Sequence, residues 1–467
     1  MAGGPPRRTT RGTIFALAWP VIVANFLQTF TTFVDMLVVG HLPGMAGIEA
    51  QSAIGAGSQI LFLNFSLMVA ISAGTVALVA REIGAGNPKA AAYATKQSLL
   101  LGVLLSLPLA AVEIAFAEPL VQAITTNSLG PAVVSGASAY LRIVVAVTAF
   151  QFVMLLSIAS LRGAGDTRTA MYVGAAVNVL NIAIVVPLVF GLGPVPSLGV
   201  VGAATGTAIA TVIGALLFLA VFLRGRTPLR LQRAGGLDWA MSRRLLRVGV
   251  PAGVESLLFQ VGITIWIALV SGYGTQAYAA HFIGLRVQSL AFMPGFGLSV
   301  AASALVGQNL GARNPDEAYR SGIEASKIAV LLMGGVAALN FLLAPFIAAA
   351  FTPDVRTQEL TVLFIRIHAL SIPAVGLYFS LDGALKGAGD TRYPLFTSVV
   401  GIFLVRLPLA FALGFAFVQA TWTWSPWIVA LPLGLAGIWL ALPVEYCVRS
   451  VLISRRFRSG RWKSITV

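Results

Sequence analysis

The 467-residue chain has few charged residues: Asp, Glu, Lys and Arg make up 10% of it, against about 25% in an average soluble protein. Hydrophobic residues make up 58%, and the mean hydropathy is +0.89. A soluble domain cannot bury this much apolar surface, so the composition indicates an integral membrane protein. The apolar runs are long and do not alternate with polar residues, which argues against a β-barrel.

Cysteine and histidine are also scarce. Cys447 is the only cysteine, which excludes an intramolecular disulfide and a CxxC metal site. His41, His281 and His368 are far apart in the sequence and form no ligand motif. We therefore expect no transition-metal site and no cofactor. The first apolar stretch is long enough to span a membrane and lacks a cleavage signature, so we expect no cleaved signal peptide.

The apolar runs predict twelve membrane-spanning helices. Charge-free stretches such as 12–34, 50–80 and 256–285 can each cross a bilayer, which takes about 20 residues. The charge-free stretch 169–223 fits two spans joined by a turn at 191–199. The expected spans are 13–40, 50–81, 96–117, 132–161, 169–191, 199–223, 245–271, 276–309, 325–350, 360–385, 393–416 and 427–450.

The basic residues indicate an orientation in the membrane. The N-terminus, the loops after even-numbered spans and the C-terminus together carry 26 of the 31 Lys and Arg residues, among them Lys386 and Arg449. By the positive-inside rule these segments are cytoplasmic, including both termini. We therefore expect a multi-pass protein of the cell's inner (plasma) membrane. The net charge of +15 then reflects this topology, and no nucleic-acid partner is expected.

The sequence also repeats itself. Leu161–Arg168 (LRGAGDTR) returns as Leu385–Arg392 (LKGAGDTR), and Gly84–Pro88 (GAGNP) returns as Gly311–Pro315 (GARNP). Six spans in each half give both halves the same orientation, and a site between two such lobes is the usual arrangement in transporters. The expected domains are an N-lobe at 1–223 (spans 1–6), a basic cytoplasmic linker at 224–247 and a C-lobe at 248–467 (spans 7–12).

Both repeated motifs are typical of turns between helices. Glycine permits a positive φ at the end of a helix. Asp, Thr and Asn are good N-caps for the next helix, and proline suits the first helical position. We interpret the motifs mainly as structural turns. The alternative is a cytoplasmic gate formed by Asp166, Arg168, Asp390 and Arg392.

Three carboxylates fall well inside expected spans: Asp35 in the first, Glu255 in the seventh and Asp382 in the tenth. An ionisable group in a span costs roughly a few kcal/mol or more, which makes each a functional hypothesis. The repeat does not duplicate them, since Trp266 and Ile158 stand at positions equivalent to Asp35 and Asp382. Purely architectural groups would more often recur. The alternative for Asp35 is a hydrogen bond between helices. For Glu255 and Asp382 it is a buried hydrogen-bonded pair, or for Glu255 a capping role near Pro251.

The first span carries a polar stripe. Asn25, Gln28, Thr32 and Asp35 recur at spacings of three and four, and Thr31 lies one turn before the aspartate. A lipid-facing stripe of this kind is implausible, so we expect these residues to line a cavity. Asp35 is then the residue that binds an ion or a proton.

Other polar residues accompany the carboxylates. Tyr378 lies one turn before Asp382, and Gln260 lies five residues after Glu255. A carboxylate and a phenol on one helical face can hold a partly dehydrated Na⁺ or share a proton. Neutral oxygens near Asp35, or else interhelical hydrogen bonds, are expected from Asn178, Asn181, Thr205 and Thr207.

With these residues the sequence resembles the multidrug and toxic compound extrusion (MATE) transporter family over nearly its whole length. The resemblance implies an all-α integral membrane fold, with twelve transmembrane helices in two pseudo-symmetric six-helix lobes. It also implies export of bulky, often cationic or amphipathic small molecules across the lipid bilayer, coupled to inward Na⁺ or H⁺. We expect a monomer. The resemblance rests on Pro20, Val34–Gly40, Gly84–Pro88, both Gly-Ala-Gly-Asp-Thr-Arg motifs, Asn178–Asn181 and Gly202–Ala204.

The resemblance also implies two coupling sites. In the N-lobe it implies a cation or proton site made of Asp35, Asn178, Asn181 and Thr207. In the C-lobe it implies a cation site, similar to that of the NorM-like branch, made of Glu255, Tyr378 and Asp382. Many relatives have a second aspartate shortly after the asparagines of the fifth span. Residues 182–187 contain no acid here, so the N-lobe site has a single carboxylate.

Two other functions stay open at this point. A related flippase for lipid-linked precursors should present basic residues to an anionic headgroup. The buried charge expected here is mostly acidic, with Arg286 and Arg406 as exceptions. An intramembrane enzyme needs clustered histidines or carboxylates, and the closest pair of acids, Asp316 and Glu317, falls in a loop. We therefore expect a secondary active transporter rather than an enzyme.

Overall fold

The computed structural model describes residues 10–42, 45–125, 130–192, 196–225, 227–231, 236–415 and 433–465. Within these ranges the chain is almost entirely helical and has no strand. Eleven helices in this part are long and apolar enough to cross a membrane, and a pair bent by 55° brings the number to twelve if it forms one span. The all-α membrane fold is confirmed. Residues 427–432 of the twelfth expected span, and 226 and 232–235 of the expected linker, lie outside the described residues.

Contacts between residues divide the chain into two compact units. Unit 1 comprises Met1–Ile22 and Val254–Thr466, and unit 2 comprises Val23–Gly253 with the last residue. The boundaries fall inside two helices, α1 (Thr10–Gly40) and α9 (Trp239–Ser271), shortly after a proline in each. A proline in a helix removes one backbone hydrogen bond and weakens the helix there. The expected lobe boundaries at 223 and 248 stay a prediction.

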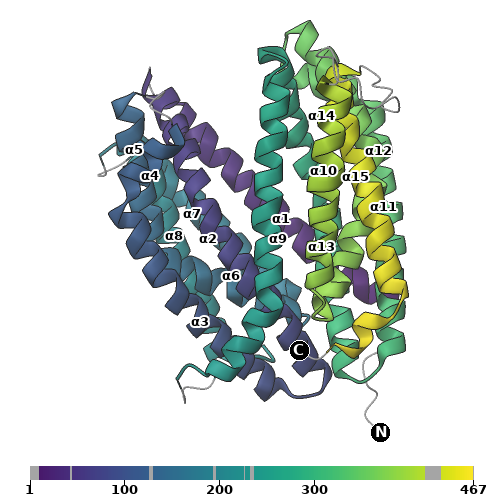
Figure 1. Ribbon diagram of the computed structural model, residues 1–467. Helices are drawn as coiled ribbons and strands as arrows, with labels where there is room; N and C mark the ends of the chain where they lie inside the picture. Colours follow the sequence, from purple (N-terminus) through teal and green to yellow (C-terminus); the bar gives the residue numbers. More distant parts are fainter. Residues whose placement is uncertain are drawn as a thin grey trace. The chain divides into compact units, whose positions relative to one another are not determined.

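Unit 2 is a helical bundle that begins with the second part of α1 (Figure 1). Large apolar side chains, including Phe152, Leu156, Phe218 and Phe222, are fully buried in its core. The bent pair of helices, α5 and α6, forms its fourth candidate span. The helices are α2 (Met45–Gly84), α3 (Pro88–Ala115), α4 (Ala117–Thr125), α5 (Pro131–Ala146), α6 (Thr148–Gly163), α7 (Thr167–Phe190) and α8 (Gly199–Leu223).

Unit 1 is a second bundle, in which α12 packs against α10, α11 and α15 (Figure 1). Its core is rich in aromatic residues, with Trp266, Phe364, Tyr446 and Phe457 almost completely buried. The elements after α9 are α10 (Thr275–Gly311), α11 (Pro315–Phe351), α12 (Val355–Gly387), α13 (Arg392–Val399), the π-helix η1 (Val400–Arg406), α14 (Leu407–Phe415), α15 (Gly434–Arg458) and the 3₁₀ turn η2 (Arg461–Ser464).

The Gly-Ala-Gly-Asp-Thr-Arg motif forms the same turn in both units. The backbone N–H of the aspartate donates to the carbonyl five residues earlier, at 2.8 Å for Asp166 and 2.9 Å for Asp390. The glycines before them, Gly165 and Gly389, have φ angles of 81° and 88°. Glycine is the residue that reaches this conformation without strain. The sequence repeat is therefore a repeat of backbone geometry.

The Gly-Ala-(Gly/Arg)-Asn-Pro motif also repeats its geometry. The side chains of Asn87 and Asn314 accept hydrogen bonds from the backbone N–H three residues later, both at 3.2 Å, which confirms the predicted caps. Gly86 has a φ of 72°, and Arg313 at the equivalent position has a φ of 57°. A non-glycine residue pays a steric cost in this region. The turn therefore imposes its geometry on the arginine.

Both ends of the described chain pack on unit 1. At the start of α1, Arg11 Nε lies 2.8 Å from a carboxylate oxygen of Glu324 on α11. After α15, Lys463 Nζ lies 3.1 Å from Asp316 at the start of α11. Trp462 is fully buried against the end of α15, where its Nε1 donates to the Phe457 carbonyl at 2.7 Å. Unit 1 therefore includes residues from both ends of the sequence.

Candidate functional site

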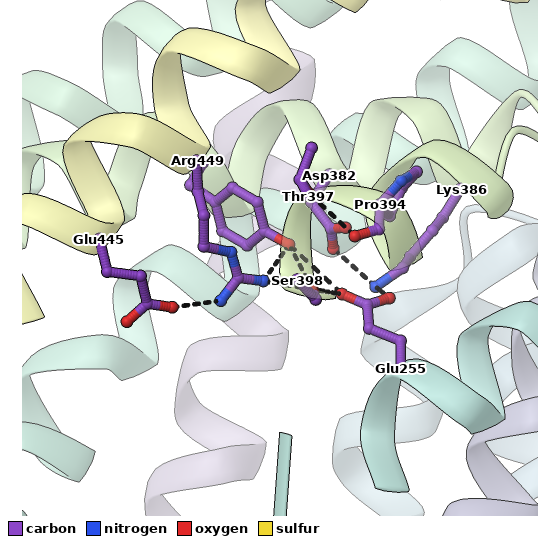
Figure 2. A network of polar contacts seen from close by, with 9 residues as sticks. Glu255, Asp382, Lys386, Pro394, Thr397, Ser398, Glu445 and Arg449 are labelled. Atoms are coloured by element: carbon purple, nitrogen blue, oxygen red, sulfur yellow. Dashed lines mark hydrogen bonds and ion pairs between the residues drawn. The ribbon is translucent and has the colours of Figure 1, made fainter. Parts of the chain in front are cut away.

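A group of charged side chains lies in unit 1 where α9, α12, α13 and α15 meet (Figure 2). Glu255 comes from α9, and Asp382 and Lys386 come from α12. Lys386 Nζ lies 2.9 Å from Glu255 Oε2 and 2.8 Å from Asp382 Oδ2. Asp382 and Lys386 are one helical turn apart and share a face of α12. The lysine thus bridges the two carboxylates that the sequence singled out and connects α9 to α12.

The other oxygen of Glu255 is occupied by hydroxyl groups. Ser398 Oγ donates to Glu255 Oε1 at 2.7 Å, and the Tyr378 hydroxyl donates to the same oxygen at 3.3 Å. Both hydroxyls accept from Arg449 Nη2, in the case of Ser398 at 2.5 Å. Arg449 itself lies 3.8 Å from Glu255. The predicted partners Glu255, Tyr378 and Asp382 therefore do come together, but with two cations among them.

A third carboxylate continues the chain of charges. Glu445 on α15 accepts from Arg449 Nη1 at 3.1 Å and from Arg406 Nε at the end of η1. The Arg449 guanidinium also lies over the rings of Tyr378 and Tyr446, at 4.0 and 5.5 Å from their centroids. Cation–π contacts of this kind stabilise a desolvated guanidinium. Glu445 therefore pairs with two buried arginines.

The three carboxylates and three basic side chains at this site carry equal and opposite formal charges. A buried charge is very costly unless it is paired and hydrogen-bonded. Each negative group here has a positive neighbour within 3.1 Å, and the side chain of Lys386, at 26% exposed, is the only member more than about a tenth exposed. We call the set the charged network; it consists of Glu255, Asp382 and Glu445 with Lys386, Arg406 and Arg449.

Local backbone features make room for the charged network. A Cβ atom added to Gly401 in η1 would lie 2.5 Å from the Arg449 side chain. A Cβ added to Gly383 would lie 2.2 Å from the carbonyl oxygen of Ser299 on α10. The π-helix η1 ends at Arg406, and π-helical turns of this kind often occur at functional sites. The glycines therefore permit the close helix packing that brings the charges together.

Two members of the charged network correct the sequence interpretation. The orientation count places Lys386 and Arg449 among cytoplasmic basic residues, yet Arg449 is 2% exposed and Lys386 is bonded to two buried carboxylates. Buried charge in the described part of unit 1 is still mostly acidic, with Glu255, Asp382, Asp390 and Glu445 against Arg406 and Arg449, but Arg449 is an exception that the sequence did not reveal. Of the two expected exceptions, Arg406 is buried and Arg286 is exposed. Counting charges along the sequence does not reveal partners on other helices.

Asp35 lies in the second part of α1 and belongs to unit 2. Its side chain is half-buried, and its Oδ1 is buried without a hydrogen-bond partner in the described part of the chain. A carboxylate oxygen with free lone pairs can accept a proton or a cation. The structure thus leaves Asp35 chemically available.

The α1 helix has two opposite faces. Phe26, Phe30, Phe33 and Leu37 are 43–59% exposed and share one face at about 100° per residue. The polar residues project from the other side of the helix, where Asn25 and Asp35 are half-buried and Gln28 and Thr32 are exposed. Thr31 is buried beside them and bonds to the Leu27 carbonyl at 3.0 Å. Lipid suits the phenylalanine face and water the polar face.

The expected neutral ligands in unit 2 are partly assembled. Asn181 Nδ2 on α7 donates to Thr207 Oγ1 on α8 at 3.2 Å, while Asn181 Oδ1 is buried and has no partner among the described residues. Asn178 is buried one turn earlier. In this part of the chain no hydrogen bond joins these residues to Asp35. In unit 1, Gln260 is half-buried on α9.

Another buried carboxylate, Glu113, was missed by the sequence analysis. Glu113, near the end of α3, is 3% exposed, and its Oε2 accepts from Asn64 Nδ2 on α2 at 2.8 Å. The second side-chain oxygen of each residue is buried without a partner in the described structure. Glu113 lies close to the end of the expected third span, where acidic residues usually face water. Asn64 in the middle of the second span was the available signal.

The two aspartates of the alternative gate have structural partners. Asp166 caps α7 by accepting from the Thr169 backbone N–H at 3.1 Å. Asp390 instead pairs with Arg456 of α15, whose Nε lies 2.7 Å from its Oδ2. Arg168 and Arg392 are exposed. These contacts support the interpretation of both motifs as turns, and the gate stays a prediction.

Comparison with known proteins gives matches over most of the chain. A family model described as MatE matches residues 20–186 and 251–412. The chain is 30% identical over 463 residues to "Probable multidrug resistance protein NorM" of Thermotoga maritima, covering 98% of this chain and 94% of that protein. It is 26% identical over 457 residues to "Multidrug resistance protein MdtK" of Proteus mirabilis, covering 95% and 94%.

Solved structures show the same fold. A crystal structure of MATE in the straight conformation superimposes with a TM-score of 0.86 at 21% identity, covering 97% of this chain and 98% of that one. A MOP superfamily transporter from Pyrococcus furiosus, described as having a binding pocket of reverse polarity that suggests a different function, gives a TM-score of 0.85 at 22% identity, with 98% of each chain covered.

Proposed function

Because the chain belongs to the MatE family of membrane transporters, we propose that it is a cation-coupled antiporter. It exports bulky, often cationic or amphipathic drugs and toxic compounds in exchange for H⁺ or Na⁺. Relatives named for multidrug resistance support the substrate class, and the family identifies a transporter rather than an enzyme. We further propose a monomer in the plasma membrane with both termini in the cytoplasm. The distribution of basic residues supports this orientation.

The observation that carries this proposal is the state of Asp35. Its carboxylate lies within a candidate span, and one buried oxygen has no partner among the described residues. Ionisable groups in spans are costly and mark ion or proton pathways. The exposed polar residues on the same side of α1, Gln28 and Thr32, give this carboxylate a hydrophilic surrounding. Asp35 can therefore bind a cation or proton and release it again.

The transport cycle follows from this change of charge. In the outward-facing state a proton or Na⁺ neutralises Asp35, assisted by neutral oxygens of Asn178, Asn181 and Thr207. A neutral site binds a cationic drug more weakly, so the drug leaves to the outside. Release of the coupling ion to the cytoplasm restores the negative charge, and the next drug molecule binds. Coupling requires that the ion and the drug prefer different states of the protein.

The test is drug efflux from proteoliposomes on which Na⁺ and pH gradients are imposed separately. The wild type should respond to at least one gradient. The Asp35→Asn variant should respond to neither, because an amide side chain stays neutral and cannot take up and release a proton or cation as a carboxylate does. Asp354→Asn is the matched control, since Asp354 is an exposed N-cap of α12 and asparagine caps equally well. Efflux that ignores both gradients in the wild type would reject secondary antiport, and normal coupling in Asp35→Asn would reject the residue.

A flippase for lipid-linked precursors is the alternative function. Such a protein needs basic side chains whose donors are free to meet an anionic headgroup. The buried basic residues of unit 1 have carboxylate partners instead: Lys386 contacts Glu255 and Asp382, and Arg406 and Arg449 contact Glu445. In unit 1 this pairing favours the antiporter over the flippase, whereas Arg162 Nε in unit 2 is buried without a hydrogen-bond partner among the described residues.

A further inference from the structure

We propose that Lys386 is the resident cation of the site formed by Glu255 and Asp382, and that its ammonium group prevents this site from taking up Na⁺. The ammonium group of Lys386 thus takes the place of a coupling ion. The inference rests on the proposed function in one respect: it states which ion can drive the proposed antiport. It places ion coupling at Asp35 and gives Lys386 the role of a residue that determines ion specificity.

The geometry places the ammonium where a bridging cation would have to lie. Lys386 Nζ is 2.9 Å from Glu255 Oε2 and 2.8 Å from Asp382 Oδ2, and these oxygens come from two different helices. A metal ion bound to both carboxylates would need the same space between them. The lysine ammonium is a compact point charge with three donors; it donates a hydrogen bond to Asp382 Oδ2 and forms an ion pair with Glu255 Oε2. Na⁺ binding between these two oxygens therefore requires that Lys386 leave first.

The surrounding charges also disfavour an added cation. The charged network contains equal numbers of positive and negative groups, and Arg449 lies 3.8 Å from Glu255. The second oxygen of Glu255 already accepts from Ser398 and Tyr378. A Na⁺ added beside Lys386 would leave an uncompensated positive charge in a buried region, which is costly. Removal of the lysine charge has the opposite effect and leaves a negative site that attracts a cation.

The repeat shows that this pairing is particular to unit 1. Arg162 is the equivalent of Lys386 in the first LRGAGDTR motif, but Ile158 stands one turn before it where Asp382 precedes the lysine. The Nε atom of Arg162 is buried and has no hydrogen-bond partner in the described structure. A basic residue at this motif position is thus common to both halves. Among the described residues, a carboxylate pair that holds it is present in unit 1 only.

The test measures equilibrium Na⁺ binding by thermal unfolding and involves no transport. All proteins carry Asp35→Asn, which removes the proposed coupling site, and Na⁺ is replaced by choline at constant ionic strength. The midpoint of unfolding should not depend on Na⁺ in this parent protein. Lys386→Met should gain a Na⁺-dependent rise of several degrees, because ligand binding to the folded state stabilises it. Lys327→Met is the control, since Lys327 is an exposed lysine paired with Glu324 at 2.8 Å.

Chemical restoration of the charge gives a second measurement. Lys386→Cys, with the exposed Cys447 changed to serine, should show the same Na⁺-dependent rise. Modification with 2-aminoethyl methanethiosulfonate attaches an ammonium group through a disulfide, with methanesulfinate as the leaving group, and should abolish the rise. The Lys386 side chain is 26% exposed, so the reagent has access to this position.

Two results would overturn the proposal. One is a Na⁺-dependent rise in the Asp35→Asn parent, where Lys386 is intact; this measurement needs no Lys386 variant to fold. The other is the absence of any Na⁺ effect in folded Lys386→Met and unmodified Lys386→Cys proteins. Neither result depends on drug efflux, so failure of this inference and failure of the proposed antiport are read in different experiments.

Discussion

Glu445 is the negative charge that holds two arginines inside unit 1, and its replacement by glutamine is expected to be strongly destabilising. Glu445 is fully buried, and Arg406 and Arg449 are 1% and 2% exposed. At an effective dielectric constant of about 20, a unit charge at the 3.1 Å between Glu445 and Arg449 interacts with about 5 kcal/mol. Removing one partner of a buried ion pair costs about 3–5 kcal/mol, because the remaining charges stay desolvated.

The matched control is an exposed pair of the same residue types. Arg356 and Glu359 lie 2.9 Å apart on the first turns of α12, with side chains 62% and 59% exposed. An exposed pair contributes about 0.2–1 kcal/mol, so Glu359→Gln should change stability by no more than that. The two substitutions make the same chemical change and differ in burial. Their comparison isolates the cost of the unpaired buried arginines.

The assay is thermal unfolding of the purified proteins, followed by a double-mutant cycle. A unit of about 150–250 residues loses about 2–4 °C per kcal/mol, so Glu445→Gln should lower the midpoint by about 6–20 °C. Combining it with Arg406→Gln should show a coupling energy of about 1–3 kcal/mol, against less than about 0.5 kcal/mol for Glu359 with Arg356. A midpoint for Glu445→Gln within a degree or two of that for Glu359→Gln would refute the reasoning.

Other predictions concern the turns and the loops. Arg313→Gly should stabilise the protein by up to about 1 kcal/mol by relieving a left-handed φ, whereas Gly389→Ala should destabilise it by about 1–2 kcal/mol; equal effects in thermal unfolding would contradict this. Hydrogen bonds, chiefly from the Met241 backbone N–H, lower the pKa of Asp238. Its contribution to stability is therefore present above the unfolded pKa and lost as the pH falls through the lower folded pKa. Asp238→Asn should lose this pH dependence, measured as unfolding midpoints between neutral and acidic pH.

The sequence predicts the helical framework well because its signals are local. Each span needs a continuous apolar run, and each repeated turn needs a glycine with positive φ followed by a capping side chain. Gly165 and Gly389 have that conformation, and Asn87 and Asn314 form the predicted caps. The left-handed backbone conformation of Arg313 follows from the repeat alone, since arginine by itself favours a negative φ.

The composition of the charged network is harder to predict because its partners come from different helices. Asp382 and Tyr378 share a helical face, and that local spacing indicated their association. Lys386 satisfies the same spacing rule, but the orientation rule assigned it to the cytoplasm. A lysine has a flexible side chain long enough to reach inward or outward. Which direction it takes depends on Glu255 from another helix, and no local pattern contains that information.

The division of the chain into units has a consequence for biosynthesis. Unit 2 is continuous from residue 23 to residue 253, so the ribosome completes it first. Unit 1 takes its first helix segment from the start of the chain. This segment has its packing partners only after α10–α15 have been made. Until α15 enters the membrane, Arg406 lacks Glu445, and Glu255 lacks the arginine that contacts its serine and tyrosine partners. A nascent chain therefore carries unpaired charge in unit 1 until its last described span is inserted, and an unpaired charge within a membrane is costly.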